Sequence, residues 1–301
     1  MTSVSGVLRP LVLVVDRRRP SSDAVVVHDG SLPPSTDTTG VRSVEHPLAL
    51  EAAVGLHDGI ASRHVPWFRA IRAARLEVEA AYDAARHDAV LARLDVRGLS
   101  AEEAYVLPTV AVVIRPGRVR GAGLAALSDV LRSGRPIHVL IAADPLAADA
   151  ASSFATHATG LGYVAAAHRE AFVLESTLDR PRHLVGGLRR MVEVLRPAAA
   201  VVSVPSRDAR TGDRRLAAAL DGRATVCFRY DAGAGVTWAD RFSLDGNPQP
   251  ERPWPRHDFA YTDAGGDSRT RSEALTWAHA VALEPGHRAR FLVLPREAWS
   301  D

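Results

Sequence analysis

A turn rich in arginine and glycine is the segment of this sequence whose residue types could bind an anion. It covers residues 115–123 and lies between an apolar run at 109–114 and an expected helix at 124–133. Guanidinium groups beside the amides that begin a helix can hold a phosphate or a carboxylate. The alternative is a tight turn with solvent-facing arginines. The candidate cofactor-binding residues are Arg115, Gly117, Arg118, Arg120 and Gly121.

Carboxylates and histidines follow the next apolar run, which covers residues 137–142. Asp144 and Asp149 come at its end, and His157 and His168 lie in the connection after it. Ligands of open α/β sheets bind at the carboxyl ends of the strands. An Asp/His metal site is therefore one interpretation, and surface or capping roles are the other, because the spacing matches no known metal motif.

Several common chemical motifs are missing. The sequence has no lysine, so it cannot contain a P-loop, and it has neither Gly-x-Ser-x-Gly nor His-Glu-x-x-His. Its one cysteine, Cys227, excludes a disulfide, a cysteine-ligated iron–sulfur cluster and a four-cysteine zinc site within this chain. A single cysteine fits a reducing, cytoplasmic setting.

The composition is that of a globular protein. Of the 301 residues, 47% are hydrophobic and 24% charged, and the formal net charge is only +2. Because the acidic residues are spread along the same segments as the arginines, we expect no nucleic-acid partner. No basic segment precedes a long apolar run at the start, so we expect no export signal and no membrane span.

The expected elements place the arginine turn between a strand and a helix. Strands that are apolar throughout belong in a sheet covered on both faces, which predicts an α/β fold with a parallel sheet covered by helices and a helical N-terminal segment. Ser100 and Glu103 predict a capping box. The expected helices cover 46–60, 67–94, 124–133, 182–195, 214–220 and 272–283. The expected strands cover 11–15, 24–28, 109–114, 137–142, 199–204, 224–230 and 288–294.

At residues 106–260 the sequence resembles the thiamine-diphosphate-binding domain near the C-terminus of pyruvate:ferredoxin and related 2-oxoacid:ferredoxin oxidoreductases. The resemblance implies a thiamine-diphosphate-domain-like α/β core, preceded by strands and a linker at 1–45 and a helical segment at 46–105, and followed by an extension at 261–301. The segments that carry it are 127–134, 137–141, 162–165, 188–204, 228–230 and 240–245.

The cofactor motifs of that family are altered in this chain. The family's metal-binding Gly-Asp-Gly aligns with residues 115–117, where Pro116 replaces the aspartate and supplies no side-chain oxygen. The family's asparagine ligand falls near Asp149, which is the candidate metal ligand, and the glycine-rich loop has become residues 150–154. We therefore expect no cofactor or, if one binds, thiamine diphosphate with or without Mg²⁺.

Three functional hypotheses follow. The first is a pseudoenzyme, a non-catalytic homologue that acts as a structural or protein-interaction module. The second is an active thiamine-diphosphate-dependent 2-oxoacid oxidoreductase component that works with iron–sulfur partner chains. The third is an anion sensor built on the arginine turn. The resemblance further implies a homodimer or a hetero-complex with oxidoreductase-like chains.

Overall fold

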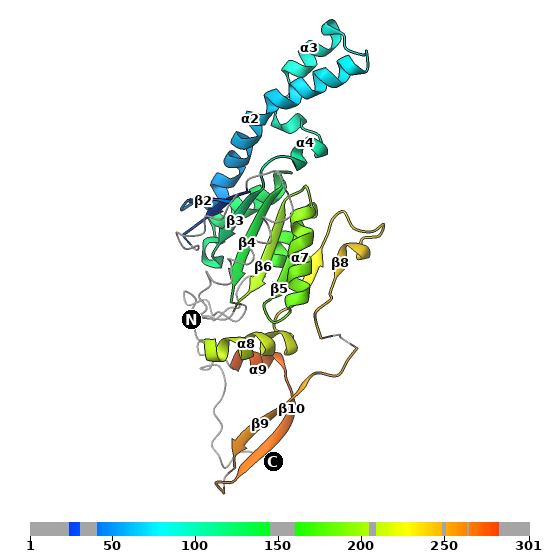
Figure 1. The fold of residues 1–301 in the computed structure, drawn as a ribbon. Helices are drawn as coiled ribbons and strands as arrows, with labels where there is room; N and C mark the ends of the chain where they lie inside the picture. Colours follow the sequence, from blue (N-terminus) through cyan, green and yellow to red (C-terminus); the bar gives the residue numbers. More distant parts are fainter. Residues whose placement is uncertain are drawn as a thin grey trace.

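The computed structural model describes residues 24–30, 41–144, 160–204, 209–248, 251–263 and 265–282. Within these ranges the chain forms an eight-stranded sheet, a two-stranded sheet and the helices around them (Figure 1). The strands are β1 (Ala24–His28), β2 (Val41–Glu45), β3 (Val110–Ile114), β4 (Ile137–Ala143), β5 (Phe172–Thr177), β6 (Ala198–Ser203), β7 (Phe228–Tyr230), β8 (Phe242–Ser243), β9 (Arg256–Thr262) and β10 (Ser268–Ala274). The α-helices are α2 (Ala49–Val78), α3 (Ala84–Ala92), α4 (Ala101–Tyr105), α5 (Ala122–Arg132), α6 (Leu161–Ala166), α7 (Pro181–Glu193), α8 (Ala209–Asp221) and α9 (Trp277–Ala282). The 3₁₀ turns are η1 (Val96–Gly98), η2 (Pro116–Arg118) and η3 (Ala239–Arg241).

The large sheet is mostly parallel. Its strand order is β2-β1-β3-β4-β6-β5-β7-β8, and only β7 and β8 run antiparallel to their neighbours. The register pairs Val110 of β3 with Ile137 of β4. The α/β class, the helix-covered parallel sheet and the helical segment before β3 are therefore confirmed. No helix in the described ranges has the length and apolar character needed to cross a membrane.

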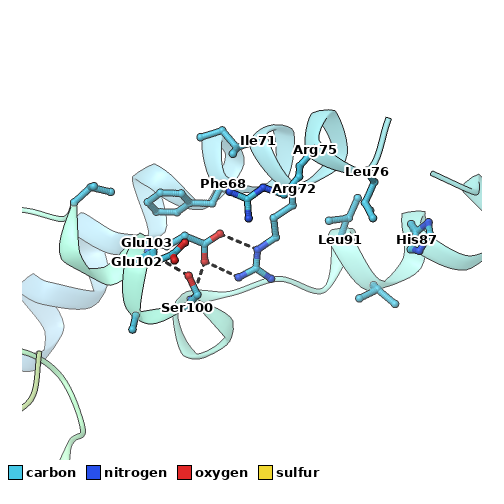
Figure 2. Close-up of a pocket in the computed structure, with 13 residues that line it drawn as sticks. Phe68, Ile71, Arg72, Arg75, Leu76, His87, Leu91, Ser100, Glu102 and Glu103 are labelled. Atoms are coloured by element: carbon cyan, nitrogen blue, oxygen red, sulfur yellow. Dashed lines mark hydrogen bonds and ion pairs between the residues drawn. The ribbon is translucent and has the colours of Figure 1, made fainter. Parts of the chain in front are cut away.

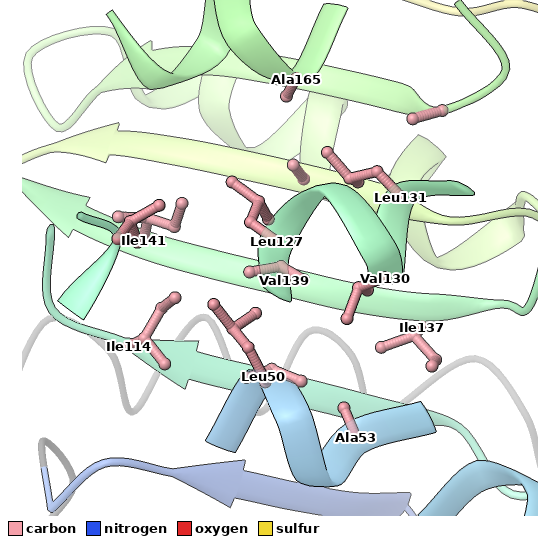
Figure 3. Close-up of a cluster of buried hydrophobic side chains, with 14 of the residues drawn as sticks. Leu50, Ala53, Ile114, Leu127, Val130, Leu131, Ile137, Val139, Ile141 and Ala165 are labelled. Carbon is pink, nitrogen blue, oxygen red and sulfur yellow. The ribbon is translucent and has the colours of Figure 1, made fainter. Parts of the chain in front are cut away.

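Both faces of the sheet are buried, as continuous apolar strands require. Alternate residues of each strand point to opposite faces. On one face Val112 and Val139 pack against α2, α5 and α6 (Figure 3). On the other face Ala111 and Leu140 pack in the cluster that contains the buried side of α7. The sheet is thus fixed between two helical layers, and its carboxyl-end loops are held on a rigid base.

A helical arm, formed by α2, α3 and α4, extends from the amino-end edge of the sheet (Figure 1). The sequence predicted two separate helices, at 46–60 and 67–94, and this prediction is wrong. Helix α2 runs through Pro66, and the helical structure breaks at residues 79–83 instead. Val65 and Phe68, on either side of Pro66, are buried in one cluster with Leu94. This shared packing keeps the helix continuous although Pro66 has no amide hydrogen to donate.

The arm is fastened to the core and within itself by bidentate ion pairs. Arg135, just before β4, donates from Nε and Nη2 to the two carboxylate oxygens of Asp58 in α2, each at 2.6 Å. Arg72 of α2 donates from Nε to Glu103 at 2.8 Å, and its Nη2 lies 2.5 Å from the other oxygen. The predicted Ser100–Glu103 capping box is confirmed at the start of α4. Paired guanidinium–carboxylate contacts of this kind fix orientation as well as position.

Several elements differ from the sequence-based expectation. β2 and β5 were missed, and Glu175 interrupts the apolar run that would have revealed β5. The expected helix at 272–283 is wrong, because β9 and β10 form an exposed antiparallel hairpin and α9 begins only at Trp277. The expected strands at 11–15 and 288–294 lie outside the described residues. The domain boundaries stay predictions, although β1 pairs directly with β3.

Candidate functional site

The arginine turn lies at the carboxyl end of β3. Pro116 begins the 3₁₀ turn η2, in which the amide of Arg118 donates to the carbonyl of Arg115 at 3.0 Å. Gly121 precedes α5 with a φ of 52°, which favours glycine. A Cβ atom on Gly123 would lie 1.8 Å from the carbonyl oxygen of Arg118, so this position also excludes a side chain. The glycines therefore serve the tight fold of the turn itself.

A buried carboxylate from the neighbouring strand engages the arginines of this turn. Asp29 follows β1, which pairs in parallel with β3, so the two strand ends meet. Its Oδ2 accepts from the amide of Arg115 at 3.2 Å and from Arg115 Nε at 3.3 Å, and it lies 3.8 Å from Arg118 Nε. The side chain of Asp29 is 1% exposed, whereas that of Arg115 is 56% exposed.

The turn fits poorly as a site for Mg²⁺ and a diphosphate. Pro116 offers no oxygen ligand, and the nearby carboxylate of Asp29 already accepts hydrogen bonds from Arg115. Gly117 and Arg120 belong to the same turn, and a Cβ atom on Gly117 would meet open space. Asp149, the candidate metal ligand, lies outside the described residues. The assignment of these residues to a cofactor stays a prediction.

The Asp/His metal interpretation is not supported for the two members that the structure describes. Asp144 follows the carboxyl end of β4, where it lies 3.6 Å from Arg215 of α8. His168 precedes β5 on the amino-end side of the sheet, and its Nδ1 lies 2.9 Å from the carbonyl of Val164. Parallel strands separate these two positions. Within the described ranges, no three His, Cys, Asp or Glu side chains gather in a way that could hold a metal ion.

A polar cluster at the end of β5 was missed from the sequence. Ser176 Oγ lies 2.9 Å from His183 Nδ1, and Ser176 also contacts the thiol of Cys227. Burial raises the pKa of Cys227 to about 11, so the thiol stays protonated and is a poor nucleophile. Ser176 is 1% exposed and out of reach of a substrate. The cluster therefore orients His183. The hydroxyl residues that end β5 were the signal that could have revealed it.

Glu175, on the same strand, is a buried carboxyl group. Burial raises its pKa to about 7, although the backbone amide of Gly162 donates a hydrogen bond to it. Its Oε2 atom has no hydrogen-bond partner within the described part of the chain. A Cβ atom on Gly162 would lie 1.9 Å from that oxygen, so α6 approaches the carboxyl group closely. Glu175 thus titrates near neutral pH inside the fold.

A groove of about 790 Å³ lies between α2, α3 and α4 of the arm (Figure 2). Apolar side chains line much of it, and Ile71 and Val90 are 56% and 67% exposed. Arg75 and His87 lie toward one end, and Glu102 lies toward the other. The groove and its charged ends become visible only in the structure.

Comparison with solved structures gives weak similarity. No protein-family model matches the chain, and no curated protein matches it. Among solved structures, a 2-oxoglutarate:ferredoxin oxidoreductase from Magnetococcus marinus, with 2-oxoglutarate, coenzyme A and succinyl-CoA bound, is similar at a TM-score of 0.38 and 9% identity. The similarity covers 65% of this chain and 60% of that one. It is too weak to assign the chain to a family.

Proposed function

We propose that this chain is a non-catalytic relative of the thiamine-diphosphate domain of 2-oxoacid:ferredoxin oxidoreductases and acts as a protein-interaction module. The observation that carries the non-catalytic part is the engagement of the arginine turn by Asp29. Arg115 donates to Asp29 from both its amide and its side chain, which leaves less of its charge for a diphosphate. Pro116, at the position of the family's metal-binding aspartate, supplies no ligand.

The interaction part of the proposal rests on the groove of the arm. Exposed apolar side chains gathered on one surface are typical of protein contacts. Here the groove lining includes Ile71, Val90 and Val106, which are each at least 50% exposed. The arm projects from the amino-end edge of the sheet, away from the carboxyl-end loops, so a partner could cover it without reaching the arginine turn (Figure 1).

The partner we propose for the groove is a second copy of this chain. Arg75 and Glu102 lie toward opposite ends of the groove, and neither has an ion-pair partner among the described residues. In a two-fold dimer with antiparallel arms, Arg75 of each copy would meet Glu102 of the other. Such isologous interfaces are self-complementary. Charge complementarity thus favours self-association. The partner's arm would at the same time cover the apolar side chains of the groove.

Calorimetric titration of the full chain with thiamine diphosphate, with and without Mg²⁺, tests the non-catalytic part. We expect no Mg²⁺-dependent, saturable binding. A ligand present at a hundred times its Kd would add about 2.7 kcal/mol to the free energy of unfolding, so a thermal melt serves as a second readout. Saturable Mg²⁺-dependent binding together with 2-oxoacid turnover would instead support an active oxidoreductase component. If thiamine diphosphate binds without Mg²⁺, the titration would be repeated with Arg115→Gln and Arg118→Gln to test whether the arginine turn holds it.

A further inference from the structure

A cavity of about 550 Å³ lies where α7 begins, beside β7 and the loop after β8. Arg180, Arg182 and His183 line it from the start of α7, Arg229 lines it from β7, and Gly246 lines it from the loop. Its volume is in the range of small-molecule sites. It also lies at the carboxyl end of β5, the edge of an α/β sheet at which ligands bind.

The wall of this cavity is fixed by Arg180. Its Nε donates to the carbonyl of Gly246 at 3.1 Å and its Nη2 donates to Asp221 at 3.1 Å, while Nη1 pairs with Asp179. Gly246 has a φ of 91°, and a Cβ atom there would lie 3.3 Å from His183 Cβ. The loop and the helix therefore meet in a defined arrangement, and a ligand would not have to order them.

Two other arginines leave an excess of positive charge. Arg182 and Arg229 line the cavity, and neither has a side-chain partner within the described part of the chain. Asp245 is the remaining acidic group in the lining, and it accepts a hydrogen bond from Ser243 Oγ at 2.7 Å. The amides of the first turn of α7 add to the positive potential, because Arg180 at the N-cap makes no side-chain capping bond.

His183 lines the same cavity, and its Nδ1 side is held by a neighbouring hydroxyl. Its Nδ1 is engaged by Ser176 Oγ, whose other contact is the protonated thiol of Cys227. The tautomer in which Nδ1 accepts from Ser176 Oγ carries its proton on Nε2. Burial and the nearby Arg229 lower the pKa of His183, which favours the neutral imidazole. In that tautomer the neutral ring offers an N–H donor at Nε2 without having to take up a proton.

We propose that this cavity binds a small organic anion, whose carboxylate or phosphate group is held by Arg182, Arg229 and Nε2 of His183. Arginine suits such groups because its planar fork donates two parallel hydrogen bonds. This site is separate from both the arginine turn and the arm, so it does not rest on the proposed function.

Titration of the full chain tests this proposal. The probes are inorganic phosphate and succinate, each at an ionic strength matched with sodium chloride, and the readouts are calorimetry and the ring signals of His183 by NMR.

We expect saturable binding of at least one probe with a Kd of about 1 mM or tighter. A response to phosphate alone or to succinate alone identifies which group the site takes. Arg182→Gln and Arg229→Gln should each weaken that binding about tenfold or more.

Arg189→Gln is the matched control, because Arg189 is exposed on the same helix and does not line the cavity. It should bind the probe as the unmodified chain does. Arg182 is also exposed, so Arg182→Gln is expected to fold even if Arg229→Gln does not. The proposal is overturned if neither probe saturates, if Arg182→Gln binds as well as the unmodified chain, or if Arg189→Gln weakens binding equally.

Discussion

Buried polar side chains at the ends of the central strands hold neighbouring segments of this protein in place. Asp29 holds the arginine turn, and Ser176 holds His183. Groups of these types often carry chemistry when they are exposed. Here their burial makes them acceptors and donors for neighbouring elements, as expected for polar groups that have been taken out of water. Glu175 departs from this pattern, because its Oε2 lacks a hydrogen-bond partner in the described ranges.

Glu175→Gln should change how stability depends on pH. The pKa of Glu175 is raised to about 7 in the folded state, above the ordinary 4.5 of the unfolded chain. The stabilisation from its protonated form is therefore complete below about pH 4.5 and is lost as pH rises through about 7, a difference of about 3 kcal/mol. In Glu175→Gln this loss should disappear, and at pH 8 the variant should be at least as stable as the unmodified chain.

Denaturant unfolding at pH 5 and pH 8 measures this effect. Glu170→Gln is the matched control, because Glu170 is exposed five residues earlier and should leave the pH dependence unchanged. The interpretation fails if Glu175→Gln loses stability between pH 5 and pH 8 as steeply as the control does.

At the scale of elements, the sequence predicts what apolar periodicity and capping specify. The continuous apolar strands β3, β4 and β6 and the Ser100 capping box were predictable from their residues. The continuity of α2 through Pro66 was not, because it depends on packing against Leu94, which is distant in sequence. The cluster around His183 was hidden for the same reason, since β5, α7 and the residue before β7 contribute one member each.

Exchanging the charges at the ends of the arm groove should show whether Arg75 and Glu102 meet across a dimer. Arg75→Glu and Glu102→Arg each place like charges together twice in a two-fold dimer, so each should weaken dimerisation about tenfold or more. The double exchange should restore it, because the opposite charges face each other again. Arg93→Glu removes an exposed arginine of the arm that does not line the groove and should have no effect. The paired contact is ruled out if the double exchange stays as weak as the single variants.

At the scale of the whole molecule, the candidate surfaces lie apart. The arm extends from the amino-end edge of the sheet, whereas the arginine turn and the His183 cavity lie at carboxyl ends of β3 and β5 (Figure 1). A change at one surface should therefore leave the others intact, in keeping with the additivity of distant sites. Self-association through the arm would leave the carboxyl-end loops open to solvent and to ligands.

The most direct test of the interaction module is sedimentation of the unmodified chain over a range of concentrations. We predict a concentration-dependent dimer that Ile71→Glu converts to a monomer, because a charge would then be buried in the apolar floor of the groove. Val78→Glu is the control, since Val78 is 89% exposed and lies outside the groove lining. A chain that sediments as a monomer at every concentration, or a dimer that Ile71→Glu leaves unchanged, would contradict the proposal that the arm is the interaction surface.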